Sequence, residues 1–196
     1  MIDHIRPALA TLGLMTVLTG VAYPLALTGL GQTLMPHQAN ASLIVRDGQV
    51  IGSALVGQAF AAPGYLHPRP SAVDYDAAAA GASNLGPTSA ALIADQAARA
   101  VDFVASTGAA SVPVDAVTAS GSGLDPHVSP ENARAQAARI AAARGVSQAR
   151  VAALIEAQVE PRWLGLFGEP RVNVLAVNLA LDAAFPAAPT GPRTEG

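Results

Sequence analysis

The chain has 196 residues, of which 51% are apolar and 13% are charged. This composition excludes an intrinsically disordered chain, which requires low hydrophobicity and high net charge. Every basic residue is an arginine, the net charge is −3, and the arginines form no basic cluster of the kind that nucleic-acid binders carry. The lack of lysine and cysteine excludes Schiff-base and P-loop lysines, disulfides, a thiolate nucleophile and cysteine zinc sites.

A long uncharged stretch near the N-terminus predicts a membrane anchor. No residue between Arg6 and Arg46 carries a full charge, and the apolar part spans about residues 8–35. A helix needs about 20 apolar residues to cross a hydrocarbon core about 30 Å thick, and a proline such as Pro24 is tolerated there. A cleaved signal peptide is the alternative, but its apolar core would be only roughly 7–15 residues long. We therefore predict one uncleaved transmembrane helix.

Positive charge sets the expected orientation of this anchor. Arg6 and the free amino terminus lie at one end of the span, and the next basic residue is Arg46. Cytoplasmic flanks of membrane helices are enriched in arginine and lysine. We therefore predict that residues 1–7 are cytoplasmic and that residues 36–185 form a soluble domain in the periplasm or outside the cell. The proline-rich residues 186–196 are expected to form a disordered tail.

The first part of the soluble domain predicts a hairpin and a long loop. Two β-rich runs, Ser42–Arg46 and Gln49–Leu55, flank Asp47 and Gly48. An Asp-Gly pair suits a type I′ turn, because both of its central residues need positive φ. Residues 60–87 are rich in proline and glycine, so we expect an irregular region of the length that is usually functional or disordered.

Three helices are expected next, over about residues 88–106, 129–144 and 147–160. The first carries an apolar stripe, which consists of Ile93, Ala97, Ala100, Val101 and Val104. The closing segment Val172–Asp182 is predicted to be a strand, with a helix as the open alternative. The fold class is therefore α+β: one transmembrane helix, then a single compact domain of helices and strands.

The densest polar cluster lies between Thr118 and Gln136. A loop rich in glycine and serine leads into a helix N-terminus, where backbone N–H groups can bind an anion. The candidate nucleotide or partner contacts are Ser120, Gly121, Ser122, Gly123, Asp125 and Gln136. The alternative is that the serines and Asp125 satisfy a tight loop, that Ser129 caps the helix, and that Gln136 is a solvated or interface residue on the helix flank. The loop is not a Walker A motif, because it lacks that motif's lysine.

Arg69 is a further candidate for contact with a partner. It stands between Pro68 and Pro70, so its backbone is stiff, and its side chain can present two donors to a carboxylate. An ion pair within the domain is the alternative. We predict no metal site, because the four histidines lack the spacing of a zinc helix.

Taken together, these segments resemble the C subunit (KdpC family) of the bacterial Kdp potassium-transporting P-type ATPase. The resemblance covers about residues 7–185. The segments that carry it are, in order, GVAYPLALTG, ANASLI, IGSALVGQAF, YLHPRPSAVDYD, GASNLGPTS, VPVDAVTASGSGLDPHVSP and GEPRVNVLAVNLALD. Each motif is modest alone, but their order on a chain of this size is specific.

The resemblance implies a non-catalytic accessory subunit of an ATP-driven, high-affinity potassium import complex in the bacterial inner membrane. The implied partners are the lipid bilayer, a channel-like subunit that handles potassium, a P-type ATPase subunit and a small membrane subunit. No nucleic acid is implied. The subunit would be needed for assembly and activity and would have no catalytic site of its own.

The family is also described as a catalytic chaperone that raises the ATP affinity of the P-type subunit. The stretch proposed for that role falls on residues 120–123, together with Gln136. A domain outside the cytoplasm cannot meet cytoplasmic ATP, and we favour the topology over the ATP contact. The alternatives are a secreted or anchored enzyme with its signal peptide cleaved near Ala41, and a cytosolic nucleotide-binding module of opposite topology.

Overall fold

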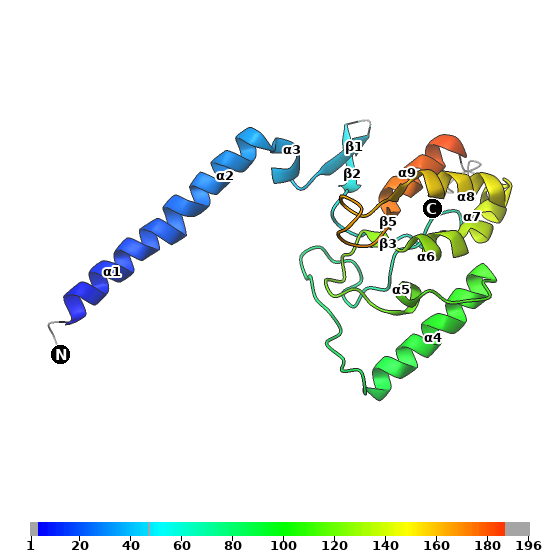
Figure 1. Cartoon of the computed structure of the whole chain (residues 1–196), viewed down its shortest axis with the longest axis horizontal. Coiled ribbons are helices and arrows are strands. Elements are labelled where there is room, and N and C mark those ends of the chain that lie inside the picture. The colour runs from blue at the N-terminus through cyan, green and yellow to red at the C-terminus, as the bar shows by residue number, and fades with distance from the viewer. Residues whose placement is uncertain (1–3, 47, 187–196) are drawn as a thin grey trace, which may run out of the picture. The chain divides into compact units, whose positions relative to one another are not determined.

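The computed structural model describes residues 4–46 and 48–186. The chain folds as two compact units, Met1–Ser53 and Ala54–Gly196 (Figure 1). The predicted tail begins at Pro186, and residues 187–196 lie outside the described residues.

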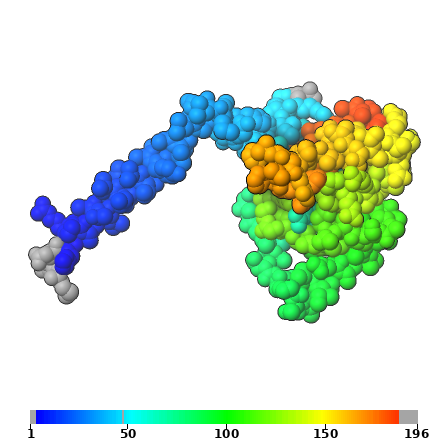
Figure 2. All heavy atoms as spheres, viewed as in Figure 1, coloured from blue at the N-terminus to red at the C-terminus, as the bar shows by residue number. Residues whose placement is uncertain are grey.

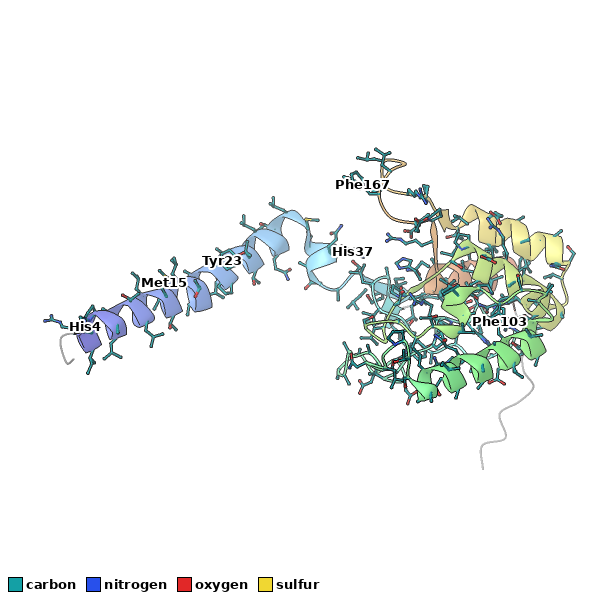
Figure 3. The ribbon with its side chains drawn as sticks, turned by 60° about the horizontal axis from the view of Figure 1, so that its bottom comes forward. His4, Met15, Tyr23, His37, Phe103 and Phe167 are labelled. Carbon is teal, nitrogen blue, oxygen red and sulfur yellow. The ribbon has the colours of Figure 1, made fainter. Side chains whose placement is uncertain are left out.

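The first unit is dominated by one long apolar helix. Its parts are α1 (Ile5–Val17), a π-helical turn (Leu18–Ala22) and α2 (Tyr23–Leu34). These form a continuous helix of 30 residues, long and apolar enough to cross a membrane. Its side chains, among them Met15 and Tyr23, point outward all round (Figure 3). The helical part of the anchor prediction is therefore confirmed.

The π-helical turn comes directly before Pro24, and proline explains it. Proline lacks an N–H, and its ring clashes with the carbonyl group four residues earlier, here that of Gly20. A wider π turn relieves this conflict without ending the helix, as is common in membrane helices. The proline therefore widens the helix at one turn.

A short turn and a hairpin complete the first unit. Helix α3 (Pro36–Ala39) is followed by strands β1 (Leu43–Arg46) and β2 (Gln49–Ser53), which pair antiparallel. The hairpin prediction is confirmed, although β2 ends two residues before the predicted Leu55. Gly48 has a φ of +78°, as the predicted turn requires, whereas Asp47 lies outside the described residues.

The second unit begins with the predicted irregular region, since residues 54–89 form turns and loops. Helix α4 (Ala90–Thr107) confirms the first predicted helix and ends at Gly108, whose φ is +68°. Its apolar stripe is not buried: Ile93 and Val101 are 59% and 68% exposed. Figure 1 shows α4 along one edge of the unit.

Four helices and a small sheet enclose the core. The remaining elements are α5 (Val114–Val117), β3 (His127–Val128), α6 (Pro130–Ala135), α7 (Ala137–Arg144), α8 (Gln148–Ala157), β4 (Val159–Glu160), β5 (Arg171–Asn173) and α9 (Val174–Ala184). The sheet is antiparallel with the order β3-β5-β4. Its core packs side chains of β3, β5 and α6–α9, such as Val172, Ile140, Ile155 and Leu181, which have no exposed surface.

Three predicted elements need correction. The helix expected over 147–160 ends at Ala157, and Val159–Glu160 form strand β4. The helix expected over 129–144 is broken at Gln136 into α6 and α7. The strand expected at Val172–Asp182 ends at Asn173, in β5, and the helix left open as the alternative begins at Val174, in α9. Asn173 caps that helix by accepting a hydrogen bond from the Ala176 N–H at 3.0 Å, and the leucines and alanines that follow favour a helix.

Candidate functional site

The irregular segment at residues 66–70 organises the polar cluster that the sequence indicates. Leu66 has no exposed surface, so its backbone N–H and C=O must find partners inside the protein. The side-chain amide of Asn178 supplies both: Oδ1 accepts from the Leu66 N–H at 2.7 Å, and Nδ2 donates to the Leu66 carbonyl at 3.0 Å. An amide side chain can do this because it carries one acceptor and two donors.

Gln136 performs the same task for the next residue. Its Oε1 accepts from the His67 N–H at 2.8 Å, and its Nε2 donates to the His67 carbonyl at 3.2 Å and to Asn132 Oδ1 at 2.8 Å. The Arg139 guanidinium also donates to Oε1, at 2.6 Å. Gln136 is only 2% exposed. The interpretation of Gln136 as a solvated flank is therefore wrong, and its hydrogen bonds hold the domain's own backbone.

Arg69 pairs inside the domain with Asp125. Its Nη1 lies 2.8 Å from Asp125 Oδ2, and each side chain keeps about a quarter of its surface exposed. The other carboxylate oxygen accepts from the His127 N–H at 2.9 Å. Burial alone would raise the pKa of Asp125, but the hydrogen bonds from His127 and the charge of Arg69 outweigh it and hold the pKa below its ordinary value.

The Gly/Ser loop packs against the same segment. The Ser120 N–H donates to the Pro70 carbonyl at 3.0 Å, and Ser120 is only 4% exposed. Ser122 Oγ accepts from the Leu124 N–H at 3.1 Å and lies 3.3 Å from Ser120 Oγ. Both predicted serines therefore take part in bonds that shape the loop.

The two glycines of this loop differ sharply. Gly123 has a φ of +70°, and a Cβ at this position would lie 2.4 Å from a Val73 methyl and 2.9 Å from the Gly81 carbonyl oxygen. A Cβ at Gly121 would meet no atom within 4 Å. Of these two positions, only 123 must therefore be glycine, because of both its positive φ and its close packing.

The expected anion position at the helix N-terminus is occupied by a carboxylate of the chain itself. Asp115 accepts from the Ser129 N–H at 2.7 Å, the Ser129 hydroxyl at 2.9 Å and Asn132 Nδ2 at 3.2 Å. Ser129 Oγ in turn accepts from the Asn132 N–H, as predicted for a helix cap. Asp115 therefore supplies the negative charge that the helix N-terminus favours.

An open pocket of about 380 Å³ lies between this cluster and the sheet. It is lined by Arg69, Asp115, Asp125, His127, Val128, Ser129, Glu169, Pro170 and Arg171. Its lining includes side chains of both charges, and those of Arg69, Asp125 and Asp115 already have partners within the domain. Among the described residues, no group of three or more histidine, aspartate or glutamate side chains is placed to hold a metal ion.

Sequence analysis missed three of the connecting residues. Asn178 lies in the predicted strand, Asp115 lies between predicted elements, and Arg144 ends a predicted helix; at none of these positions does the residue type carry a signal of a long-range bond. Arg144 is the least exposed of the ion-paired groups in the described residues, at 1% of its side chain. It donates to Asp182 at 2.9 Å, to the Gly64 carbonyl at 2.6 Å and to the Phe185 carbonyl at 2.6 Å.

These observations define a class of protein: one apolar helix of membrane-spanning length, then an α+β domain whose central polar groups bind one another. The chain belongs to the family described as K+-transporting ATPase, c chain, whose model matches residues 5–183. It is therefore a subunit of the Kdp ATPase complex and not the catalytic one.

Relatives of high identity span the whole chain. The potassium-transporting ATPase KdpC subunit of Cereibacter sphaeroides (strain ATCC 17029) is 67% identical over 94% of this chain and 99% of its own length. The KdpC subunits of Caulobacter vibrioides (strain NA1000) and Rhodospirillum rubrum are each 56% identical, over 95% and 96% of this chain and 96% and 100% of theirs.

Proposed function

We propose that this chain is the accessory subunit through which an ATP-driven, high-affinity potassium import complex is assembled and kept active. Its partners would be the channel-like potassium-translocating subunit, the P-type ATPase subunit and a small membrane subunit. The apolar helix would anchor it in the inner membrane with the N-terminus in the cytoplasm and the domain outside. The family membership supports the complex, and the position of Arg6 supports the orientation.

One observation carries the role assigned to the domain. The groups considered as ligand contacts, from Ser120 to Gln136, are engaged in bonds that fix the backbone of residues 66–70 and the helix N-terminus. A phosphate at that helix N-terminus would have to displace the Asp115 carboxylate. A domain fixed in this way loses little conformational entropy when it docks. We therefore assign the cluster to shaping a docking surface, and we do not assign ATP contact to it.

The matched pair Gly123→Ala and Gly121→Ala tests this role. Each variant is expressed with its partner subunits, and the complex is purified for subunit stoichiometry and for potassium-dependent ATPase activity over a range of ATP concentrations. We expect Gly123→Ala to lower the amount of this subunit in the complex, because the added Cβ meets Val73 and the Gly81 carbonyl. The KM for ATP of the complex that retains the subunit should not change. Gly121→Ala should match the wild type.

The result that would contradict the proposal is equally specific. If Gly123→Ala complexes keep normal stoichiometry but need more ATP for half-maximal activity, the loop acts on nucleotide affinity. The catalytic-chaperone description of the family would then apply to this loop, and the assembly role would be wrong.

A further inference from the structure

The loop between β4 and β5 carries a cluster of large apolar side chains that are mostly exposed to solvent. We call residues 163–167 the apolar tip. Its four large side chains are Trp163, Leu164, Leu166 and Phe167, which are 69%, 71%, 78% and 60% exposed. Figure 3 shows Phe167 at the outer end of this loop, pointing away from the domain, and Figure 2 shows the loop (orange) standing at the surface.

The apolar tip is held in one shape by its own backbone. Trp163 and Phe167 exchange two backbone hydrogen bonds, of 2.9 and 3.0 Å, and their rings lie 5.7 Å apart. Gly165, with a φ of +73°, closes the turn, and its N–H donates to the Arg162 carbonyl. An ordered loop that exposes four large apolar groups marks an interaction surface.

The polar groups of the loop are arranged as a lipid surface requires. The N–H groups of Trp163, Gly165, Leu166 and Phe167 all donate within the loop, which matters because hydrocarbon offers no partner for a free N–H. The charged groups lie at its base and are paired: Arg162 with Glu169 at 2.5 Å, and Arg171 with Glu160 at 2.8 Å. The tip itself is therefore uncharged, and four of its five N–H groups are hydrogen-bonded within the loop.

The rest of the chain favours the bilayer over a protein partner. Helix Ile5–Leu34 is of membrane-spanning length, so a chain anchored by it keeps the domain near a membrane surface at a high effective concentration. Under this condition even a tip that is too small to bind lipid by itself is sufficient to hold the domain at the membrane surface. Tryptophan is also enriched at membrane–water interfaces, where its ring lies in apolar surroundings and its N–H stays near water.

We propose that the apolar tip inserts into the interfacial region of the bilayer and forms a second contact of this chain with lipid. The proposal rests on the anchor helix of the proposed function, but it holds for either side of the membrane. If the tip inserts, the domain contacts the membrane at a defined site and its orientation relative to the membrane is restricted.

Trp163 provides the test, because it is the single tryptophan of the chain. The full-length chain is reconstituted into vesicles of phosphatidylethanolamine and phosphatidylglycerol, and flotation first establishes that the anchor holds. Trp163 fluorescence is then recorded with lipids brominated near the headgroup and with aqueous acrylamide. We expect a blue-shifted emission that brominated lipid quenches and acrylamide reaches poorly.

Two variants control the experiment. In Trp163→Phe/Val114→Trp, the only tryptophan stands at another exposed apolar position, since Val114 is 77% exposed. Its emission should stay water-like, which excludes quenching through mere proximity to the membrane. In Leu164→Ser/Leu166→Ser, Trp163 remains as the reporter and should become accessible to acrylamide.

Two results would overturn the proposal. The first is water-like emission from Trp163 in chains that float with the vesicles. The second is protection of Trp163 only after the other subunits are added, which would make the tip a protein contact. A chain that fails to float would instead refute the anchor itself.

Discussion

Two side-chain amides act as substitutes for a neighbouring strand along residues 66–67. Asn178 and Gln136 each bind the N–H and the C=O of one buried or half-buried residue. An irregular segment can enter the core only if its backbone groups are satisfied, and these amides satisfy them. The residue types at 136 and 178 are therefore determined by the backbone groups that they bind as well as by the space that their side chains fill.

The change Gln136→Ala should destabilise the domain. It leaves the His67 N–H and carbonyl without their partner, and an unsatisfied buried group costs roughly 1–3 kcal/mol. We expect a lower thermal midpoint of unfolding for the purified full-length chain. Gln148, which is exposed at the start of α8, provides the matched control, and Gln148→Ala should change little. Equal midpoints for both variants would contradict the structural role of Gln136.

Acidic pH should lower the stability of the folded domain, because His67 in the polar cluster resists protonation. Burial and then the nearby Arg139 lower the pKa of His67 below its ordinary value. The folded protein therefore resists protonation at a pH where the unfolded chain accepts it, so stability is full above about pH 6.5 and falls as the pH drops below that value. Asp125 acts in the same direction only near and below about pH 4, because its pKa is lowered from a lower starting value.

Chemical unfolding of the full-length chain between neutral and mildly acidic pH would measure this effect. We expect the wild type to lose stability over that range and His67→Phe to show a flatter dependence. A wild-type stability that rises as the pH falls would contradict the sign of the His67 shift.

At the scale of elements, α7 and α9 are joined by a buried arginine. Arg144 ends α7, where a basic residue suits the negative end of a helix, and its guanidinium also lies 4.9 Å from the Tyr65 ring centre. Through Asp182 and backbone carbonyls it connects the last turn of α9 with the loop at residue 64.

Replacing this arginine should be costly. Arg144→Met keeps the apolar stem but removes the ion pair with Asp182 and the hydrogen bonds to three backbone carbonyls, and removal of one partner of a buried ion pair costs about 3 kcal/mol or more. The control is Arg134→Met, because Arg134 pairs with Glu156 on the surface, where ion pairs contribute little. Thermal unfolding of both variants checks this, and a larger loss for Arg134→Met would contradict it.

The elements themselves were predicted well wherever local signals decide. The cap at Ser129 and the turn at Gly48 depend on neighbours in the sequence. The segment at Val172–Asp182 was predicted as a strand with a helix as the alternative, because its apolar residues fit a buried strand or a buried helix equally well; the structure has a strand only up to Asn173 and a helix beyond it. The N-cap bond of Asn173 decides between them, and it is visible only in three dimensions.

The hydrogen-bond partners within the polar cluster were harder to predict than the elements. The sequence drew attention to Ser120, Asp125, Gln136 and Arg69, which the structure joins in one cluster, but it did not indicate their partners. Those partners are as distant as His67 from Gln136, and composition holds no information on which groups meet across such a separation. Asp115 lies at the helix N-terminus where an anion was expected, yet in the sequence it is an acidic residue with no visible link to Ser129.

At the scale of the whole molecule, the chain consists of an apolar helix, which we propose is the anchor, and a domain with its own core. The anchor is a 30-residue apolar helix, and the domain is a core of α6–α9 over a small sheet. This division suits a subunit that contributes position and surface to a complex whose catalytic subunit is another chain.

The side of the membrane on which the domain lies decides between assembly from outside and contact with ATP. A single cysteine introduced as Gln49→Cys in this cysteine-free chain, expressed with its partner subunits, can be treated with a membrane-impermeant maleimide. His4→Cys marks the opposite end of the anchor. Our account predicts that the Gln49→Cys chain reacts in cells whose outer membrane alone is permeabilised and that the His4→Cys chain reacts only after the inner membrane is lysed. The reverse pattern would contradict it.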